Sequence, residues 1–76
     1  MLVEDAFIDL TSVPCPINFV RAKLMIDTLR LGQILKIELD LGEPHQSVIK
    51  SMQEEGHEII QETRLASSME IFIKKN

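Results

Sequence analysis

Four segments of the chain have the pattern of hydrophobic and polar residues expected of β-strands, namely residues 6–10, 33–40, 58–64 and 69–73. Alternation with a period of two is clean at 33–40 and 69–73, and at 6–10 it places Phe7 on the face opposite the other apolar residues. The expected core side chains are Ala6, Ile8 and Leu10, then Leu35, Ile37 and Leu39, then Ile60 with Ile59, and last Met69, Ile71 and Ile73. The opposite face is then largely polar and carries Lys36, Glu38, Asp40, Gln61 or Glu62, and Phe72, the last as an exposed contact.

Two longer segments have the period of an α-helix. The first runs from Pro16 to Arg30, about four turns, and Gly32 is its expected stop. Its apolar positions form two adjoining stripes, one of Ile17, Val20, Leu24 and Thr28, the other of Ala22, Met25, Ile26 and Leu29. The second begins at Pro44 as its first residue, with Glu43 as the cap, and runs to Glu55. Its expected core face is Val48, Ile49 and Met52.

The order of elements, β-α-β-α-β-β, predicts an α/β (α+β) two-layer sandwich. Each helix lies between two strands, so right-handed crossovers place both helices on one face of a four-stranded mixed sheet. Residues 1–76 are expected to form a single domain, because 76 residues are too few for two cores.

Composition and charge narrow the classes of function. The chain is 45% hydrophobic and 26% charged, as in an ordinary globular protein, and carries a net charge of −4. Its eight basic residues are scattered, and it has no Trp or Tyr to stack on bases, so direct nucleic-acid binding is not expected. An acidic body of this kind predicts protein partners instead. No apolar run approaches the ~20 residues of a membrane span, and the start lacks the basic residues of a signal peptide. One unpaired cysteine suits a reducing compartment, so a cytoplasmic location is expected.

Cys15, the only cysteine, has a proline on each side. Pro14 and Pro16 restrict the residues before them to extended geometry, so the loop is stiff before any tertiary contact forms. Pro16 suits the first helical position, which would make Cys15 the N-cap. Its sulfur would lie beside unpaired N–H groups at the positive end of the helix, which favour the thiolate. Cys15 is therefore the candidate nucleophile, and the alternative is a buried, inert side chain.

The residues around this cysteine resemble a known family. Cys15-Pro16-Ile17-Asn18, shortly after Asp9-Leu10, is similar to the signature of the TusA/SirA sulfur-carrier proteins, usually Cys-Pro-x-Pro, from which Asn18 departs. Later features of the family recur at residues 40–44 (an acidic-to-proline turn), 55–57 (Glu-Gly-His) and 74–75 (two lysines). The resemblance covers nearly the whole chain and implies the fold predicted above.

The resemblance implies a sulfurtransferase that needs two protein partners. Cys15 would accept sulfane sulfur as a persulfide from a cysteine desulfurase or rhodanese-like enzyme and relay it to an acceptor protein. Family members serve tRNA thiolation, molybdenum-cofactor chemistry or thiosulfate handling, and the sequence does not choose among these pathways. The alternative is a non-catalytic binding or regulatory module in which Cys15 is structural or senses oxidants.

Residues near the cysteine are the remaining site candidates. Pro14, Pro16 and Asn18 are expected to support the loop and the helix start, although Asn18, at the third helical position, is equally well an ordinary polar residue. Arg21 and Lys23 are candidates for docking an acidic partner, against the default of solvation.

The histidines and acids elsewhere carry no predicted chemistry. His45 and His57 with one cysteine make an incomplete zinc set, so no metal and no cofactor are expected. Asp40, Glu43 and the Glu54-Glu55 pair are expected on a solvated face.

Overall fold

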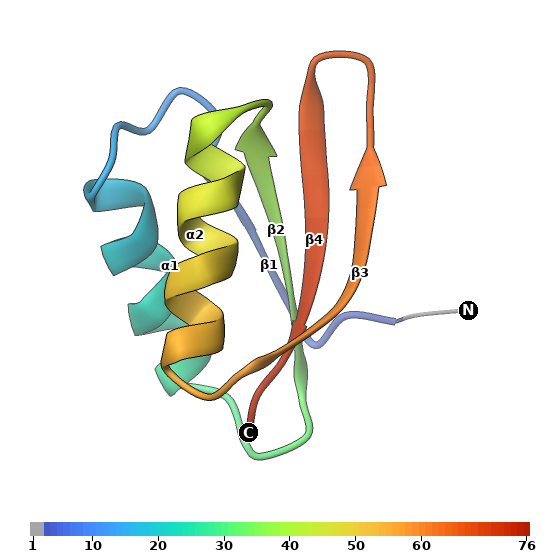
Figure 1. The fold of residues 1–76 in the computed structure, drawn as a ribbon. Coiled ribbons are helices and arrows are strands. Elements are labelled where there is room, and N and C mark those ends of the chain that lie inside the picture. The colour runs from blue at the N-terminus through green and yellow to red at the C-terminus, as the bar shows by residue number, and fades with distance from the viewer. Residues whose placement is uncertain (1–2) are drawn as a thin grey trace.

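A computed structural model describes residues 3–76 (Figure 1). It contains four strands and two helices, in the predicted order. In chain order they are β1 (Ala6–Asp9), α1 (Ile17–Asp27), β2 (Ile34–Asp40), α2 (Glu43–Glu54), β3 (Glu58–Arg64) and β4 (Ser68–Lys74).

The strands form one mixed sheet in the order β1-β2-β4-β3. β1 and β2 are parallel, whereas β4 runs antiparallel to both β2 and β3. Figure 1 shows α1 and α2 side by side on the same face of this sheet. The predicted two-layer sandwich is therefore confirmed.

The core fills the space between the sheet and the two helices. Its fully buried side chains are Leu10, Ala22, Ile26, Leu35, Ile37, Leu39, Val48, Met52, Ile71 and Ile73. Alternation in β2 and β4 and the 3.6-residue period of α2 predict most of them. On β3, however, Ile59 and not Ile60 packs against the core, because the register shifts between Ile59 and Gln61.

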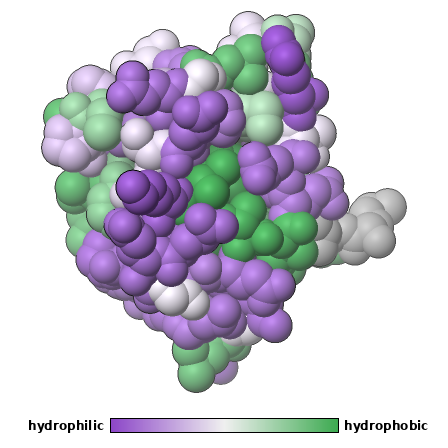
Figure 2. Space-filling view, viewed as in Figure 1, coloured by the Kyte–Doolittle hydropathy of each residue, from purple (hydrophilic) through white to green (hydrophobic). Residues whose placement is uncertain are grey.

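Only one of the two apolar stripes predicted on α1 faces the core. Asn18, Ala22 and Ile26 are buried and four residues apart, so they set the packed face of the helix. Ile17, Val20 and Leu24, on the other predicted stripe, are instead 46%, 48% and 64% exposed. Hydrophobic atoms accordingly reach the surface along the edge where α1 lies (Figure 2). In a two-layer fold nothing covers the far side of a helix, so a second stripe stays exposed.

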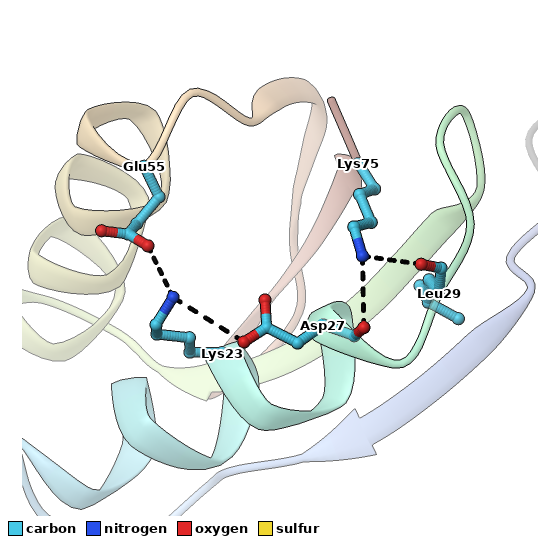
Figure 3. Close-up of polar contacts among 5 residues, drawn as sticks. All are labelled: Lys23, Asp27, Leu29, Glu55 and Lys75. Carbon is cyan, nitrogen blue, oxygen red and sulfur yellow. Dashed lines mark hydrogen bonds and ion pairs between the residues drawn. The ribbon is translucent and has the colours of Figure 1, made fainter.

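α1 ends earlier than predicted, at Asp27 and not at Arg30. The hydroxyl of Thr28 donates to the carbonyl of Met25 at 2.6 Å, which closes the last turn. Lys75 Nζ, from the end of the chain, donates to the carbonyl oxygens of Asp27 and Leu29 at 3.2 and 2.7 Å (Figure 3). These carbonyls would otherwise lack a helical partner, so Lys75 caps the helix and ties it to the end of the sheet.

The opposite face of the sheet is polar, as predicted, but Phe72 is not an exposed contact. It is only 7% exposed, and it stands on a central strand in register with Lys36. Lys36 Nζ lies 5.7 Å from the Phe72 ring centre and 5.5 Å from that of Phe7 on the neighbouring strand, and it pairs with Glu70 at 3.1 Å. The lysine stem therefore covers the ring while its ammonium is held by the carboxylate.

α2 begins one residue before its predicted start. Gly42 is the N-cap, with φ of 95°, and Glu43 and Pro44 are the first two helical residues. Glycine adopts this left-handed conformation without a steric penalty, which makes Gly42 and not Glu43 the cap.

Among residues 3–76, no helix is long and apolar enough to cross a membrane.

Candidate functional site around Cys15

The loop between β1 and α1 carries the cysteine and is fixed by two aspartates. The Thr11 hydroxyl and backbone N–H donate to Asp9 Oδ1 at 2.6 and 2.9 Å. These donors, the hydroxyl first, favour the charged carboxylate and hold the pKa of Asp9 below its usual value. Ser12 adopts a left-handed conformation, with φ of 64°, and its N–H donates to Asp40 Oδ2 at 2.8 Å. The loop is therefore tied to the end of β2 as well as to β1.

Cys15 lies in a turn directly before α1, and it is exposed and unpaired. Its peptide bond to Pro16 is cis. Pro16 is the N-cap of α1, so Cys15 lies one residue further from the helix than predicted. The prediction placed Pro16 at the first helical position; the helix instead begins with Ile17.

Most N–H groups of the first turn already have acceptors within the chain. The Asn18 N–H donates to the carbonyl of Pro14 at 3.0 Å, and the Phe19 N–H donates to the side-chain oxygen of Asn18 at 2.7 Å. Over residues 3–76 this leaves the Ile17 N–H as the first-turn donor without an acceptor. The helix start can therefore offer fewer hydrogen bonds to an anion at Cys15 than the sequence suggested.

Asn18 is fully buried, at the second helical position and not the third. Its side-chain Nδ2 has no hydrogen-bond partner within the described part of the chain. Neither feature follows from the sequence, where a polar residue in a first turn is ordinarily solvated. Asn18 supports the loop through two hydrogen bonds, one to Pro14 and one to Phe19, and buries an unpaired amide in doing so.

A hollow of about 260 Å³ adjoins Cys15, and the first turns of α2 line the rest of it. The lining residues are Cys15, Glu43, Pro44 and Ser47. The sequence analysis missed the last three as neighbours of the cysteine. The signal was available in the topology: β1 and β2 are parallel neighbours, so the segments that follow their C-terminal ends meet at one edge of the sheet.

Arg21 and Lys23, the predicted docking residues, have different surroundings. Arg21 is exposed on α1. Lys23 Nζ contacts Glu55 Oε1 at 2.6 Å and Asp27 Oδ2 at 3.7 Å (Figure 3). The hydrogen bond to Glu55, with a smaller contribution from Asp27, raises the pKa of Lys23 above its usual value. The charge of Lys23 is therefore already paired and links α1 to the end of α2.

Both histidines make local structural contacts. His45 Nδ1 accepts the N–H of Gly42 at 3.1 Å, at the start of α2, and His57 Nδ1 accepts that of Asn76 at 3.3 Å. Neither histidine lines the hollow, and within residues 3–76 its lining contains no basic side chain. Glu43 is therefore the acid–base side chain that shares the hollow with Cys15, and within residues 3–76 no histidine or lysine lines it.

Comparison with known proteins places the chain in a family. The family model described as sulfurtransferase TusA matches residues 6–75. The chain is 29% identical over 69 residues to a "Putative sulfur carrier protein" of Archaeoglobus fulgidus, an alignment that covers 90% of this chain and 78% of that protein.

The fold has a counterpart among solved structures. The crystal structure of a SirA-like protein from Desulfitobacterium hafniense superposes with a TM-score of 0.78 at 21% identity, covering 91% of this chain and 95% of that one. The match extends over the sheet, both helices and the cysteine loop, since the family model begins at the first residue of β1 and ends just beyond β4. The chain therefore belongs to the TusA family of sulfurtransferases, which are sulfur carriers.

Proposed function

We propose that Cys15 carries sulfane sulfur as a persulfide, accepting it from one protein and passing it to another. The observation that supports this most directly is the exposure of the thiol in a turn tied to the ends of β1 and β2. A carrier has to offer its sulfur to the active site of each partner, and an exposed cysteine on a stiff loop meets that requirement.

The transfer is a nucleophilic substitution at sulfur. The Cys15 thiolate attacks the outer sulfur of a donor persulfide, the new S–S bond forms at Cys15, and the S–S bond of the donor breaks. The donor cysteine leaves as a thiolate with the electron pair, and the proton of the donor persulfide stays with the transferred sulfur. No oxidant or reductant is consumed, and the second transfer, to the acceptor, is the same step in reverse roles.

The surface beside Cys15 suits contact with a protein. Ile17, Val20 and Leu24 form an exposed apolar stripe that begins two residues after the cysteine, and Arg21 lies among them. Central apolar contacts with a flanking arginine are typical of protein interfaces. The donor class we propose is a cysteine desulfurase or rhodanese-like enzyme, with Arg21 as the cation available to an acidic group of the partner and Lys23 as a secondary one, since its charge is shared with Glu55.

Mass spectrometry of the intact protein tests the proposal. Incubation with a persulfide-loaded desulfurase should add the mass of one sulfur atom, which a reductant should remove. The Cys15→Ser variant should gain nothing under the same conditions. Unchanged wild-type mass, together with rapid oxidation of the thiol by dilute peroxide, would contradict the carrier and indicate a redox sensor instead.

A further inference from the structure

The hollow beside Cys15 contains one formal charge, and that charge is negative. The lining residues are Cys15, Glu43, Pro44 and Ser47, and the formal charge among them is that of the Glu43 carboxylate. Glu43 is exposed and has no cationic partner within residues 3–76. The ion pairs of the described chain involve Lys23 and Lys36, which serve other carboxylates.

Helix dipoles offset this charge only in part. The start of α2 contributes a partial positive charge of about half a unit, and at the start of α1 two of the first-turn N–H groups are already used by Pro14 and Asn18. A full negative charge on Glu43 therefore outweighs them at short range. The hollow is neutral to negative with Glu43 in place, and it would become positive without it.

We infer that Glu43 is a specificity-determining residue, which disfavours small free anions at Cys15. The inference rests on the proposed sulfur transfer. It names the class of sulfur donor that the Glu43 carboxylate would reject, which is small anions that carry sulfane sulfur, such as thiosulfate. A donor protein brings hydrogen-bond donors and cations that neutralise its own persulfide, whereas a free anion brings none. The carboxylate therefore biases Cys15 toward sulfur delivered by a protein.

The rejected reaction is balanced without any further reagent. With thiosulfate, the Cys15 thiolate would form an S–S bond to the sulfane sulfur, the bond from that sulfur to the sulfonyl group would break, and sulfite would leave with the electron pair. Thiosulfate carries two negative charges and the thiolate one, so repulsion by Glu43 should slow this reaction more than it slows attack on a neutral reagent.

Alkylation by a matched pair of reagents measures this bias directly. Iodoacetate and iodoacetamide react with the thiolate in the same way and differ by one negative charge. At low ionic strength the Glu43→Gln variant should raise the iodoacetate-to-iodoacetamide rate ratio about three- to tenfold. This is the range that Coulomb's law gives for unit charges ~6 Å apart at an effective dielectric constant of about 40–80, which suits an exposed carboxylate. At 1 M salt, where the Debye length is ~3 Å, most of the gain should disappear. Because the ratio cancels any common change in thiolate population, it reports charge selection alone.

Two further variants control the measurement. Glu54→Gln removes the same charge from α2 eleven residues further on, ~16 Å along the helix, and should change the ratio by less than about twofold. Ser47→Asp adds a second carboxylate to the hollow and should lower the ratio. Thiosulfate is the sulfur probe, and persulfide formation from it should increase in Glu43→Gln.

The outcomes separate the two proposals. A rate ratio that is the same in wild type, Glu43→Gln and Ser47→Asp would overturn charge selection, even if a loaded desulfurase still transferred sulfur to Cys15. A wild-type protein that gained no sulfur from the desulfurase would overturn the carrier, even if the ratio changed as expected.

Discussion

Replacing Asn18 with aspartate should destabilise the fold in a manner that depends on pH. Asn18 is 0% exposed, and its Oδ1 accepts the Phe19 N–H while its Nδ2 has no partner. In Asn18→Asp the shape is kept, but one carboxylate oxygen would occupy the site of that unpaired nitrogen. A buried carboxylate with one donor resists ionisation, so its pKa in the folded protein should rise well above the unfolded value of ~3.9.

The size of the effect follows from three competing terms. Full burial raises a carboxylate pKa by up to 3–5 units, and each unit corresponds to about 1.4 kcal/mol, so desolvation costs about 4–7 kcal/mol. The start of α1 returns up to ~2 kcal/mol, because a negative charge at the second helical position is favourable. The Phe19 N–H returns about 1 kcal/mol more by bonding to a charged acceptor. Desolvation wins, and we expect Asn18→Asp to lose about 1–4 kcal/mol at pH 7.

The pH dependence has a definite sign. A carboxylate whose folded pKa is raised binds its proton more tightly in the folded state, so the loss is small below the unfolded value of ~3.9 and grows by about 1.4 kcal/mol per pH unit up to the folded pKa. Urea unfolding of Asn18→Asp and wild type at pH 7 and pH 4 measures the difference at each pH, so the protonation of other carboxylates cancels.

Asn76→Asp, the same substitution at an exposed position, should change stability by less than about 0.5 kcal/mol. A deficit for Asn18→Asp equal to that of Asn76→Asp, or one that does not shrink at pH 4, would refute the reasoning.

Three further predictions concern the surface of α1 and the two shifted pKa values. Leu24→Asp, in the exposed stripe, should slow sulfur transfer from a loaded donor several-fold and leave the alkylation rate of the thiol unchanged. A transfer rate equal to that of wild type would show that the stripe does not contact the donor. Thr11→Val removes the hydroxyl donor and should raise the pKa of Asp9 toward its usual value, which NMR titration of the Asp9 carboxyl carbon measures. The lowered pKa of Asp9 stabilises the fold at neutral pH, and this stabilisation is lost as pH falls through the folded value; in Thr11→Val it should be smaller. Glu55→Gln should lower the pKa of Lys23 toward its usual value, which NMR titration of the Lys23 side chain measures. The contribution of Lys23 to folding stability is complete at neutral pH and is lost as pH rises through the folded pKa. An unchanged titration would show that Asp27 alone holds the ammonium.

The sequence predicts the sheet better than it predicts the helix beside the site. Strand alternation in β2 identifies its core residues correctly because a strand has only two faces. α1 has apolar residues on two stripes, and the period alone cannot say which stripe meets the sheet. The buried Asn18 lies on the stripe that meets the sheet. Local patterns do not predict this, because a polar residue in the first turn of a helix is ordinarily solvated and Asn18 buries an unpaired amide.

The cysteine could be found from the sequence, but its neighbours could not be found from local patterns. Cys15 stands out because two prolines flank it. Glu43 and Ser47 lie 28 and 32 residues further along the chain. They lie near the cysteine only because β1 and β2 are parallel and adjacent. Deriving that contact requires the strand order of the sheet, which the pattern of elements leaves open between several arrangements.

The size of the hollow agrees with the proposed transfer of sulfur between protein partners. At about 260 Å³ it lies below the roughly 300–1,000 Å³ typical of sites that enclose a small molecule. A substrate held there would stay largely in water, and no basic residue of the lining would assist it. In the proposed transfer, the partner protein that covers Cys15 would supply the enclosure and the charge compensation. An exposed thiol, a hollow smaller than a typical small-molecule site and an apolar stripe starting two residues away are together the features that the proposed sulfur carrier would use to present its sulfur to a partner.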